Sequence, residues 1–274
     1  MFLDFEFDNE RASDYGLIVG SFQGDAGMEI LSSGSDLALN PTKPSRSDRF
    51  LIHHLDYSEP YTYTFQVIKN YCTAKNGDIS LSPKEISSIQ RWLCRRNSLH
   101  KFKIYAEGYN NLYWMGSFYA QQVSLNGKIV GLELTFTADS PYAYSEPISL
   151  AFDCKEQTPF EIYNMSDEEG AIHPHMEITF LKESDAPYEF TLSNSLDRRI
   201  MKIKGCTQNE TITIDGKNLM IQSSNLSHTS LSKDFNYFFP KIINTYHGGK
   251  NTFTPNADCN ITFTYSPICK VGLP

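Results

Sequence analysis

The chain has 274 residues, 40% hydrophobic and 13% aromatic, which suits one large domain or two ordinary ones and excludes a disordered protein. Its formal charge of −8, from 24 Lys and Arg against 32 Asp and Glu, argues against nonspecific nucleic-acid binding, which requires a basic surface. No stretch approaches the roughly 20 apolar residues of a membrane span, and the start of the chain lacks the basic and apolar blocks of a signal peptide.

The six cysteines include no C-x-x-C pair, so the sequence supports neither a zinc ribbon nor a thioredoxin motif. We expect the chain to be made in the cytoplasm and to stay there or leave without a cleaved leader. For a chain of this kind, free buried thiols are favoured over disulfides, although the even number of cysteines leaves disulfides open.

Two-residue alternation of apolar and polar side chains dominates the first half and predicts β-strands. The Asn126-Gly127 pair predicts a type I′ hairpin turn, in which both central residues need positive φ. The segment NPTKPSRS, residues 40–47, contains two prolines and is expected to be a loop. Strands are predicted at 2–7, 16–22, 49–56, 61–70, 100–108 and 112–125, followed by a hairpin partner that ends at Ala138.

One segment departs from this alternation and predicts a helix over residues 82–97. Ser82 suits the N-cap, Pro83 the first helical position, and Glu85 completes a capping box. The apolar stripe consists of Ile86, Ile89 and Leu93 with Trp92 beside it, and Arg91, Arg95 and Arg96 gather near the end, where they complement the helix dipole.

The segment TFTADSPYAYSEP, residues 135–147, divides the sequence into two domains. Pro141 and Pro147 resist strand continuation, so residues 141–147 are predicted to be a stiff linker into which Tyr142 and Tyr144 pack. The first domain is expected at 1–140. The second, at 148–274, is expected to be a β-sandwich because it contains many short strands, at 148–153, 159–164, 175–181, 188–194, 200–205, 211–221 and 260–267.

Residues that could carry chemistry are sparse. His173 and His175 could share a metal if they lay on one strand face, but Pro174 separates them, and a surface or subunit contact is the favoured interpretation. Asp167, Glu168 and Glu169 are interpreted as a solvated acidic loop. Because the G-x-S-x-G, P-loop and dinucleotide patterns are absent, we predict no catalytic, cofactor or metal site.

Aromatic residues are abundant across the predicted hairpin of the first domain. Core packing is the favoured interpretation, while a sugar-stacking platform or a subunit interface remains an alternative, since tyrosine and tryptophan are common there.

Taken in order, several short motifs resemble the distal tail (Dit) proteins of long-tailed phages, and the resemblance extends over essentially the whole chain. The residues that carry it are Asp14-Tyr15-Gly16-Leu17, Phe65-Gln66-Val67, Asp139-Ser140-Pro141-Tyr142-Ala143 and Gly249-Lys250-Asn251.

The resemblance implies a mainly β chain, with an N-terminal β-sandwich that carries one helix and a C-terminal galectin-like β-sandwich. It implies a homo-hexameric ring at the tail tip of a phage or prophage, without catalysis. The ring would join the tail tube protein to the hub (tail-associated lysin) protein, and in some relatives it carries a receptor-binding protein. The implied location is the virion, after synthesis in the cytoplasm of a bacterial host.

A closed ring requires two different surfaces of each subunit to meet. We expect strands within 49–70 and 112–138 to carry this contact. Two other hypotheses stay open: a carbohydrate-binding β-sandwich protein that recognises a host-surface glycan, and a hydrolase that uses Asp167 or Glu168. The candidate ring-interface residues are Phe50, Ile52, Tyr61, Tyr63, Tyr113, Trp114 and Phe118.

Overall fold

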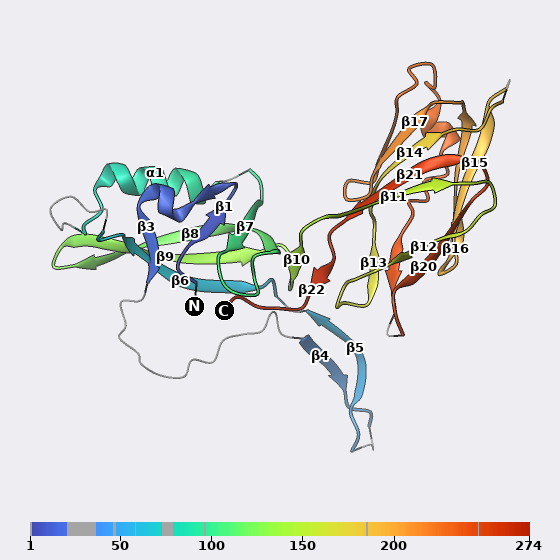
Figure 1. Cartoon of the computed structure of the whole chain (residues 1–274). Coiled ribbons are helices and arrows are strands. Elements are labelled where there is room, and N and C mark those ends of the chain that lie inside the picture. Colours follow the sequence, from blue (N-terminus) through green and yellow to red (C-terminus); the bar gives the residue numbers. More distant parts are fainter. Residues whose placement is uncertain are drawn as a thin grey trace. The chain divides into compact units, whose positions relative to one another are not determined.

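The computed structural model divides the chain into two compact units, residues 1–145 with 269–274 and residues 146–268 (Figure 1). The structure describes residues 2–20, 37–45, 48–57, 59–72, 79–95, 97–184, 186–245 and 247–274. Strands account for most of the regular structure in both units, and one helix is longer than a single turn among these residues. The predicted mainly β fold is therefore confirmed.

The first unit is built on one large sheet with the strand order β2-β1-β7-β8-β9-β6-β3. The N–H of Val19, in β3, donates to the carbonyl of Leu3, just before β1, at 3.1 Å. The chain that leads into β1, near one end of the strand order, therefore lies beside β3 at the other end. The sheet therefore curls around its own core. Its strands are β1 (Phe5–Phe7), β2 (Glu10–Arg11), β3 (Leu17–Gly20), β6 (Thr62–Lys69), β7 (His100–Ile104), β8 (Leu112–Leu125) and β9 (Lys128–Ala138), joined by β10 (Ala143–Ser145) and β22 (Ile268–Cys269).

Alternation along β9 shows why the sheet forms. Leu132, Leu134 and Phe136 are buried, whereas Glu133 and Thr135 between them point away from the core. Successive strand side chains face opposite sides, so this order buries one face of the sheet. The predicted turn between β8 and β9 is confirmed, because Asn126 and Gly127 have φ values of 50° and 77°. The core is rich in aromatic residues, which include Phe5, Phe65, Phe102, Trp114, Phe118 and Phe136.

Helix α1 (Pro83–Leu93) packs on this core and begins as predicted, with Ser82 as N-cap and Glu85 in a capping box. Trp92 anchors it: its Nε1 donates to the carbonyl of Phe7 at 2.9 Å. The helix ends earlier than the predicted residue 97, because the Arg95 side chain turns back, donates from Nε to the Trp92 carbonyl and pairs with Asp8. Arg96 lies outside the described residues, as do residues 21 and 22 of the predicted second strand.

Replacing Glu85 with glutamine should remove an acid-sensitive contribution to the stability of the first unit. Hydrogen bonds from Lys69 and then Ser82 lower the pKa of Glu85 from 4.5 to about 2. The contribution is therefore complete above the unfolded value of 4.5 and is lost as the pH falls toward 2. Because the side chain is 42% exposed, solvent screening limits the effect to about 1 kcal/mol or less.

Thermal unfolding of the wild type and Glu85→Gln at a series of pH values measures this contribution. The two curves should differ above the unfolded pKa and converge in acid. A difference that stays constant across the series would contradict the assignment.

The predicted loop at 40–47 is wrong in its first part. Strand β4 (Leu37–Thr42) pairs antiparallel with β5 (Leu51–Tyr57), with a register shift between Leu39 and Pro41. A proline is tolerated here because the two strands form a separate sheet, in which the missing N–H interrupts no central ladder.

The second unit is a sandwich of two antiparallel sheets with the orders β11-β21-β14-β17-β18 and β12-β20-β15-β16. Both sheets contribute side chains to one core, which includes Met176, Phe190, Phe253 and Phe263. The elements are β11 (Ile148–Cys154), β12 (Phe160–Tyr163), β13 (Gly170–Ile172), β14 (His175–Phe180), β15 (Tyr188–Asn194), β16 (Asp197–Cys206), β17 (Thr211–Asp215), β18 (Met220–Ser223), α2 (Leu231–Asp234), β19 (Ile242–Asn244), β20 (Lys250–Pro255) and β21 (Cys259–Tyr265), with the 3₁₀ turn η1 (Ala12–Tyr15) in the first unit.

Residues 269–274 return to the first unit, whereas the second domain was expected to extend over 148–274. Leu273 is buried in the first core, and its N–H donates to the hydroxyl of Tyr61 at 2.7 Å. Tyr63 in turn donates its hydroxyl to the carbonyl of Pro274 at 2.8 Å. Residues 269–274 thus close the first core with an apolar side chain and two hydrogen bonds, which local sequence pattern could not indicate.

Candidate subunit interface

The β4–β5 hairpin carries a concentration of exposed apolar side chains, here called the hairpin patch. The two strands pair with each other and, among the described residues, with no other strand. A two-stranded ribbon has no second layer of its own to cover its faces. Six large side chains are each more than half exposed, namely Leu37, Leu39, Phe50, Leu51, Ile52 and Leu55.

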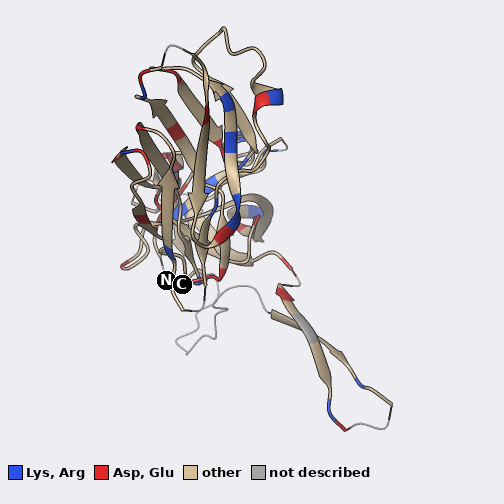
Figure 2. Cartoon of the chain, turned by 90° about the vertical axis from the view of Figure 1, so that its right-hand side faces the viewer, with Lys and Arg blue, Asp and Glu red and all other residues tan. Residues whose placement is uncertain are grey.

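Charged residues on this hairpin are confined to its ends. Figure 2 shows blue and red positions near the turn of the hairpin and red positions near its base. The Nζ of Lys43 lies 5.8 Å from the centre of the Phe50 ring. Burying one large apolar side chain contributes about 1.5–3 kcal/mol, so six of them on one hairpin suit a protein partner.

The structure separates the candidate ring-interface residues into three groups. Phe50 and Ile52 belong to the hairpin patch, and Tyr63 and Tyr113 are half-buried. The remaining three, Tyr61, Trp114 and Phe118, lie in the core of the first unit with exposures of 2%, 0% and 6%. Because their own subunit already covers these three side chains, they are not available for contact with a neighbouring subunit.

The predicted linker residues lie largely within the first unit. Tyr144 in β10 pairs with Tyr113 of β8, and the two rings stack at 5.6 Å. Burial raises the pKa of Tyr144 to about 12. Tyr142 makes edge contacts with Tyr144 and with Tyr57, the last residue of β5, at 5.9 and 6.2 Å. Pro141 is half-buried and Pro147 is exposed.

His173 and His175, the histidines of the sequence pattern, have different surroundings. His173 is half-buried, and burial lowers its pKa. His175 begins β14 and lies 3.9 Å from Glu177. Within the described ranges no three His, Cys, Asp or Glu side chains are grouped as metal ligands. In the acidic run, the carbonyl of Glu168 accepts a hydrogen bond from Asn244, which ties the loop to β19.

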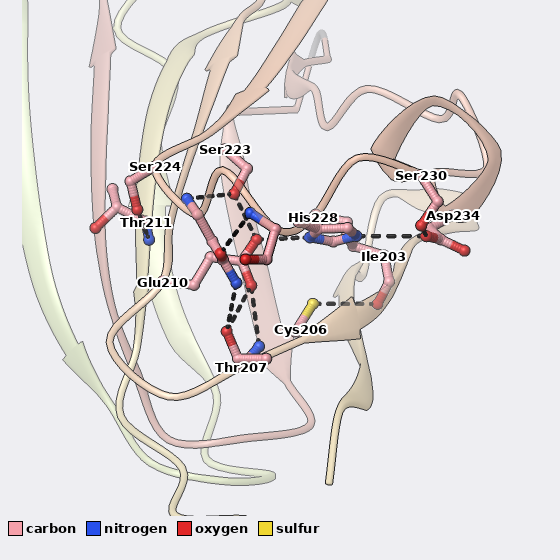
Figure 3. A network of polar contacts seen from close by, with 12 residues as sticks. Ile203, Cys206, Thr207, Glu210, Thr211, Ser223, Ser224, His228, Ser230 and Asp234 are labelled. Atoms are coloured by element: carbon pink, nitrogen blue, oxygen red, sulfur yellow. Dashed lines mark hydrogen bonds and ion pairs between the residues drawn. The ribbon is translucent and has the colours of Figure 1, made fainter.

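A buried polar network, which no sequence pattern indicated, lies in the second unit (Figure 3). Glu210 is 2% exposed and accepts hydrogen bonds from the Thr207 N–H, the Ser223 hydroxyl and His228 Nδ1, at 3.0, 2.6 and 2.6 Å. The other imidazole nitrogen lies 3.4 Å from Asp234 Oδ2. Burial acts to raise the pKa of Glu210, but these hydrogen bonds outweigh it and lower the pKa.

The network ties together three segments within residues 207–228. Thr207 and Glu210 come from the β16–β17 connection, Ser223 ends β18, and His228 precedes α2. Satisfying a buried carboxylate with several donors makes the arrangement specific, because leaving it unpaired is costly. This network therefore stabilises the fold of the second unit.

Among the described residues, no helix is long and apolar enough to cross a membrane. Two family models match the chain. One, described as a phage tail protein N-terminal domain, matches residues 1–140, and the other, described as a phage tail C-terminal domain, matches residues 142–265. No curated protein shows significant sequence similarity to the chain.

Solved phage structures share the fold over nearly the whole chain. The Dit protein of phage SPP1, described as a paradigm of the hub adsorption apparatus in phages that infect Gram-positive bacteria, is similar with a TM-score of 0.65 and 12% identity, covering 97% of this chain and 99% of that one. A chain of the phage P2 baseplate in its activated conformation with calcium is similar with a TM-score of 0.52 and 10% identity, covering 99% and 100%. The chain therefore belongs to the matched family of phage tail proteins and has the fold of Dit.

Proposed function

We propose that this chain is a distal tail protein that forms a hexameric ring at the phage tail tip, with the hairpin patch as one half of the contact between neighbouring subunits. The observation that carries the proposal is the set of six exposed apolar side chains on a hairpin that pairs with no other described strand. Family membership and the Dit fold over the whole chain support it.

A ring of identical subunits requires a heterologous interface, in which one surface of each copy meets a different surface of the next. A hairpin with exposed apolar residues on both strands is suited to lie across a neighbour, because it can bury both faces without changing the core of its own unit. Its paired strands also leave two edges that a neighbouring strand could extend.

Substituting Phe50 and Ile52 together with aspartate should prevent assembly while the subunit stays folded. Both side chains are more than half exposed in the single chain, so the change affects burial between copies and not the core. Leu226→Asp is the matched control, since Leu226 is 93% exposed and lies in the second unit. Native mass spectrometry should give hexamers for the wild type and the control, and monomers for the double variant.

A double variant that still forms hexamers would contradict the role of the hairpin patch. A wild type that stays monomeric at high concentration would contradict the ring itself. Circular dichroism of each variant reports whether the fold is kept.

In the assembled tail, the ring would contact the tail tube protein on one side and the hub protein on the other, with a receptor-binding protein as a further partner. The role is structural, and the location is the virion. The alternative, recognition of a host glycan by the second unit, is less well supported, because Trp92 and Trp114 are both buried in the first unit and offer no stacking surface to a sugar. Glycan-array binding by the assembled protein would favour that alternative.

A further inference from the structure

Three side chains near the start of β7 form a continuous polar chain. Ser98 Oγ lies 2.8 Å from His100 Nε2, and His100 Nδ1 lies 3.2 Å from Asp8 Oδ1. The serine is exposed, whereas the imidazole is only 16% exposed. Nucleophilic catalysis by serine requires this arrangement, in which one imidazole nitrogen contacts the hydroxyl and the other contacts a carboxylate. The carboxylate fixes the tautomer in which Nε2 can accept a proton.

Rigid elements hold the carboxylate and the imidazole. Asp8 occupies the turn between β1 and β2 with φ of 53°, and its N–H donates to the carbonyl of Lys101 at 3.0 Å. Arg95 binds Asp8 Oδ2, which leaves Oδ1 directed at the imidazole. The His100 ring packs edge-on against Phe7 at 5.6 Å. Groups fixed in this way need little reorganisation before they react.

The serine opens on a hollow of about 290 Å³. The other residues that line it are Arg95, Asn97, Leu99 and Ser117. Asn97 and Ser117 have side chains that can donate hydrogen bonds, the kind of group that stabilises an oxyanion. The volume is at the lower limit of small-molecule sites, so the hollow suits a short acyl group better than a long one.

We propose that Ser98, His100 and Asp8 form a hydrolytic site for esters of short carboxylic acids, separate from the role in the ring. Ser98 Oγ adds to the ester carbonyl carbon while its proton passes to His100 Nε2. The bond to the alcohol oxygen then breaks, and the alcohol leaves with that proton. Water adds to the acyl-serine and gives a proton to Nε2, and this proton returns to Ser98 as the acid departs. Asp8 holds the imidazole in position throughout.

The test uses the full chain and p-nitrophenyl acetate. The wild type should release p-nitrophenol above the buffer rate, and Ser98→Ala and His100→Gln should each lower the enzymatic rate by roughly 100-fold or more. Combining the two should cost no more than either alone, since the residues act as one unit. Ser124→Ala, an exposed serine on β8, is the matched control and should keep the wild-type rate.

A second measurement identifies the nucleophile directly. A fluorophosphonate reagent should modify Ser98 in the wild type and should modify it far more slowly in His100→Gln, with the labelled peptide read by mass spectrometry. The proposal is overturned by a wild-type rate equal to buffer, by turnover that survives Ser98→Ala, or by a label on another serine. Each result is independent of whether the protein forms a ring.

Discussion

Replacing His228 with alanine should lower the free energy of unfolding of the second unit by about 1–3 kcal/mol, the usual loss when a buried polar group is left without one of its hydrogen-bond partners. His228 donates to Glu210, and the two side chains are 3% and 0% exposed. Without the imidazole, the carboxylate stays buried and keeps the bonds from Thr207 and Ser223 but loses the one from His228. Asp234 loses the same partner on the other side.

Urea unfolding followed by circular dichroism measures this loss. His175→Ala is the matched control, because the His175 side chain is 46% exposed and 3.9 Å from Glu177, so its removal should change stability by less than about 1 kcal/mol. Adding Glu210→Gln to His228→Ala should recover part of the loss, since the uncompensated charge is then gone. Equal stability of the two histidine variants would show that the network contributes little.

Replacing Trp114 with alanine should cost the first unit about 3–5 kcal/mol through the cavity it leaves. Trp114 is fully buried and lies 6.3 Å from Phe102, in the aromatic core beneath the curled sheet. Trp114→Phe should cost much less, because it keeps most of the ring volume and because the indole N–H has no hydrogen-bond partner among the described residues.

Tyr119 on the same strand is the matched control, since it is 61% exposed. Tyr119→Ala should change the free energy of unfolding by about 0.5 kcal/mol or less. If Trp114→Ala unfolded as the wild type does, Trp114 could not be a core residue, and its candidacy as an interface residue would return.

Local sequence signals predicted local structure well. The start of α1 and the turn at Asn126-Gly127 depend on capping and on positive φ, which neighbouring residues specify. The end of α1 was predicted too late, because it is set by the distant contact between Arg95 and Asp8. Strand β4 was missed because Pro41 within it and Pro44 after it indicate a loop unless the pairing with β5 is known. Strand β20 was also missed. It includes Asn251, a polar residue that is fully buried and whose amide donates hydrogen bonds to the carbonyls of Ile243 and Gly249.

The candidate sites depend even more on contacts between distant parts of the chain, which local sequence does not indicate. Aromatic residues in 112–125 were named as interface candidates, but sequence alternation does not say which face of a sheet its own subunit covers, and Trp114 and Phe118 are covered. Phe50 and Ile52 stayed exposed because their strands form a sheet of their own. Asp8 comes from a different segment than Ser98 and His100, and the antiparallel pairing of β1 with β7 brings it to the other two. No spacing in the sequence indicates that pairing.

Negative-stain electron microscopy of the purified chain tests the central proposal most directly. If the hairpin patch joins neighbouring subunits, the particles should be rings with sixfold symmetry and a central opening, and Phe50→Asp with Ile52→Asp should reduce them to single subunits. Wild-type particles that remain single subunits at high concentration would contradict the account.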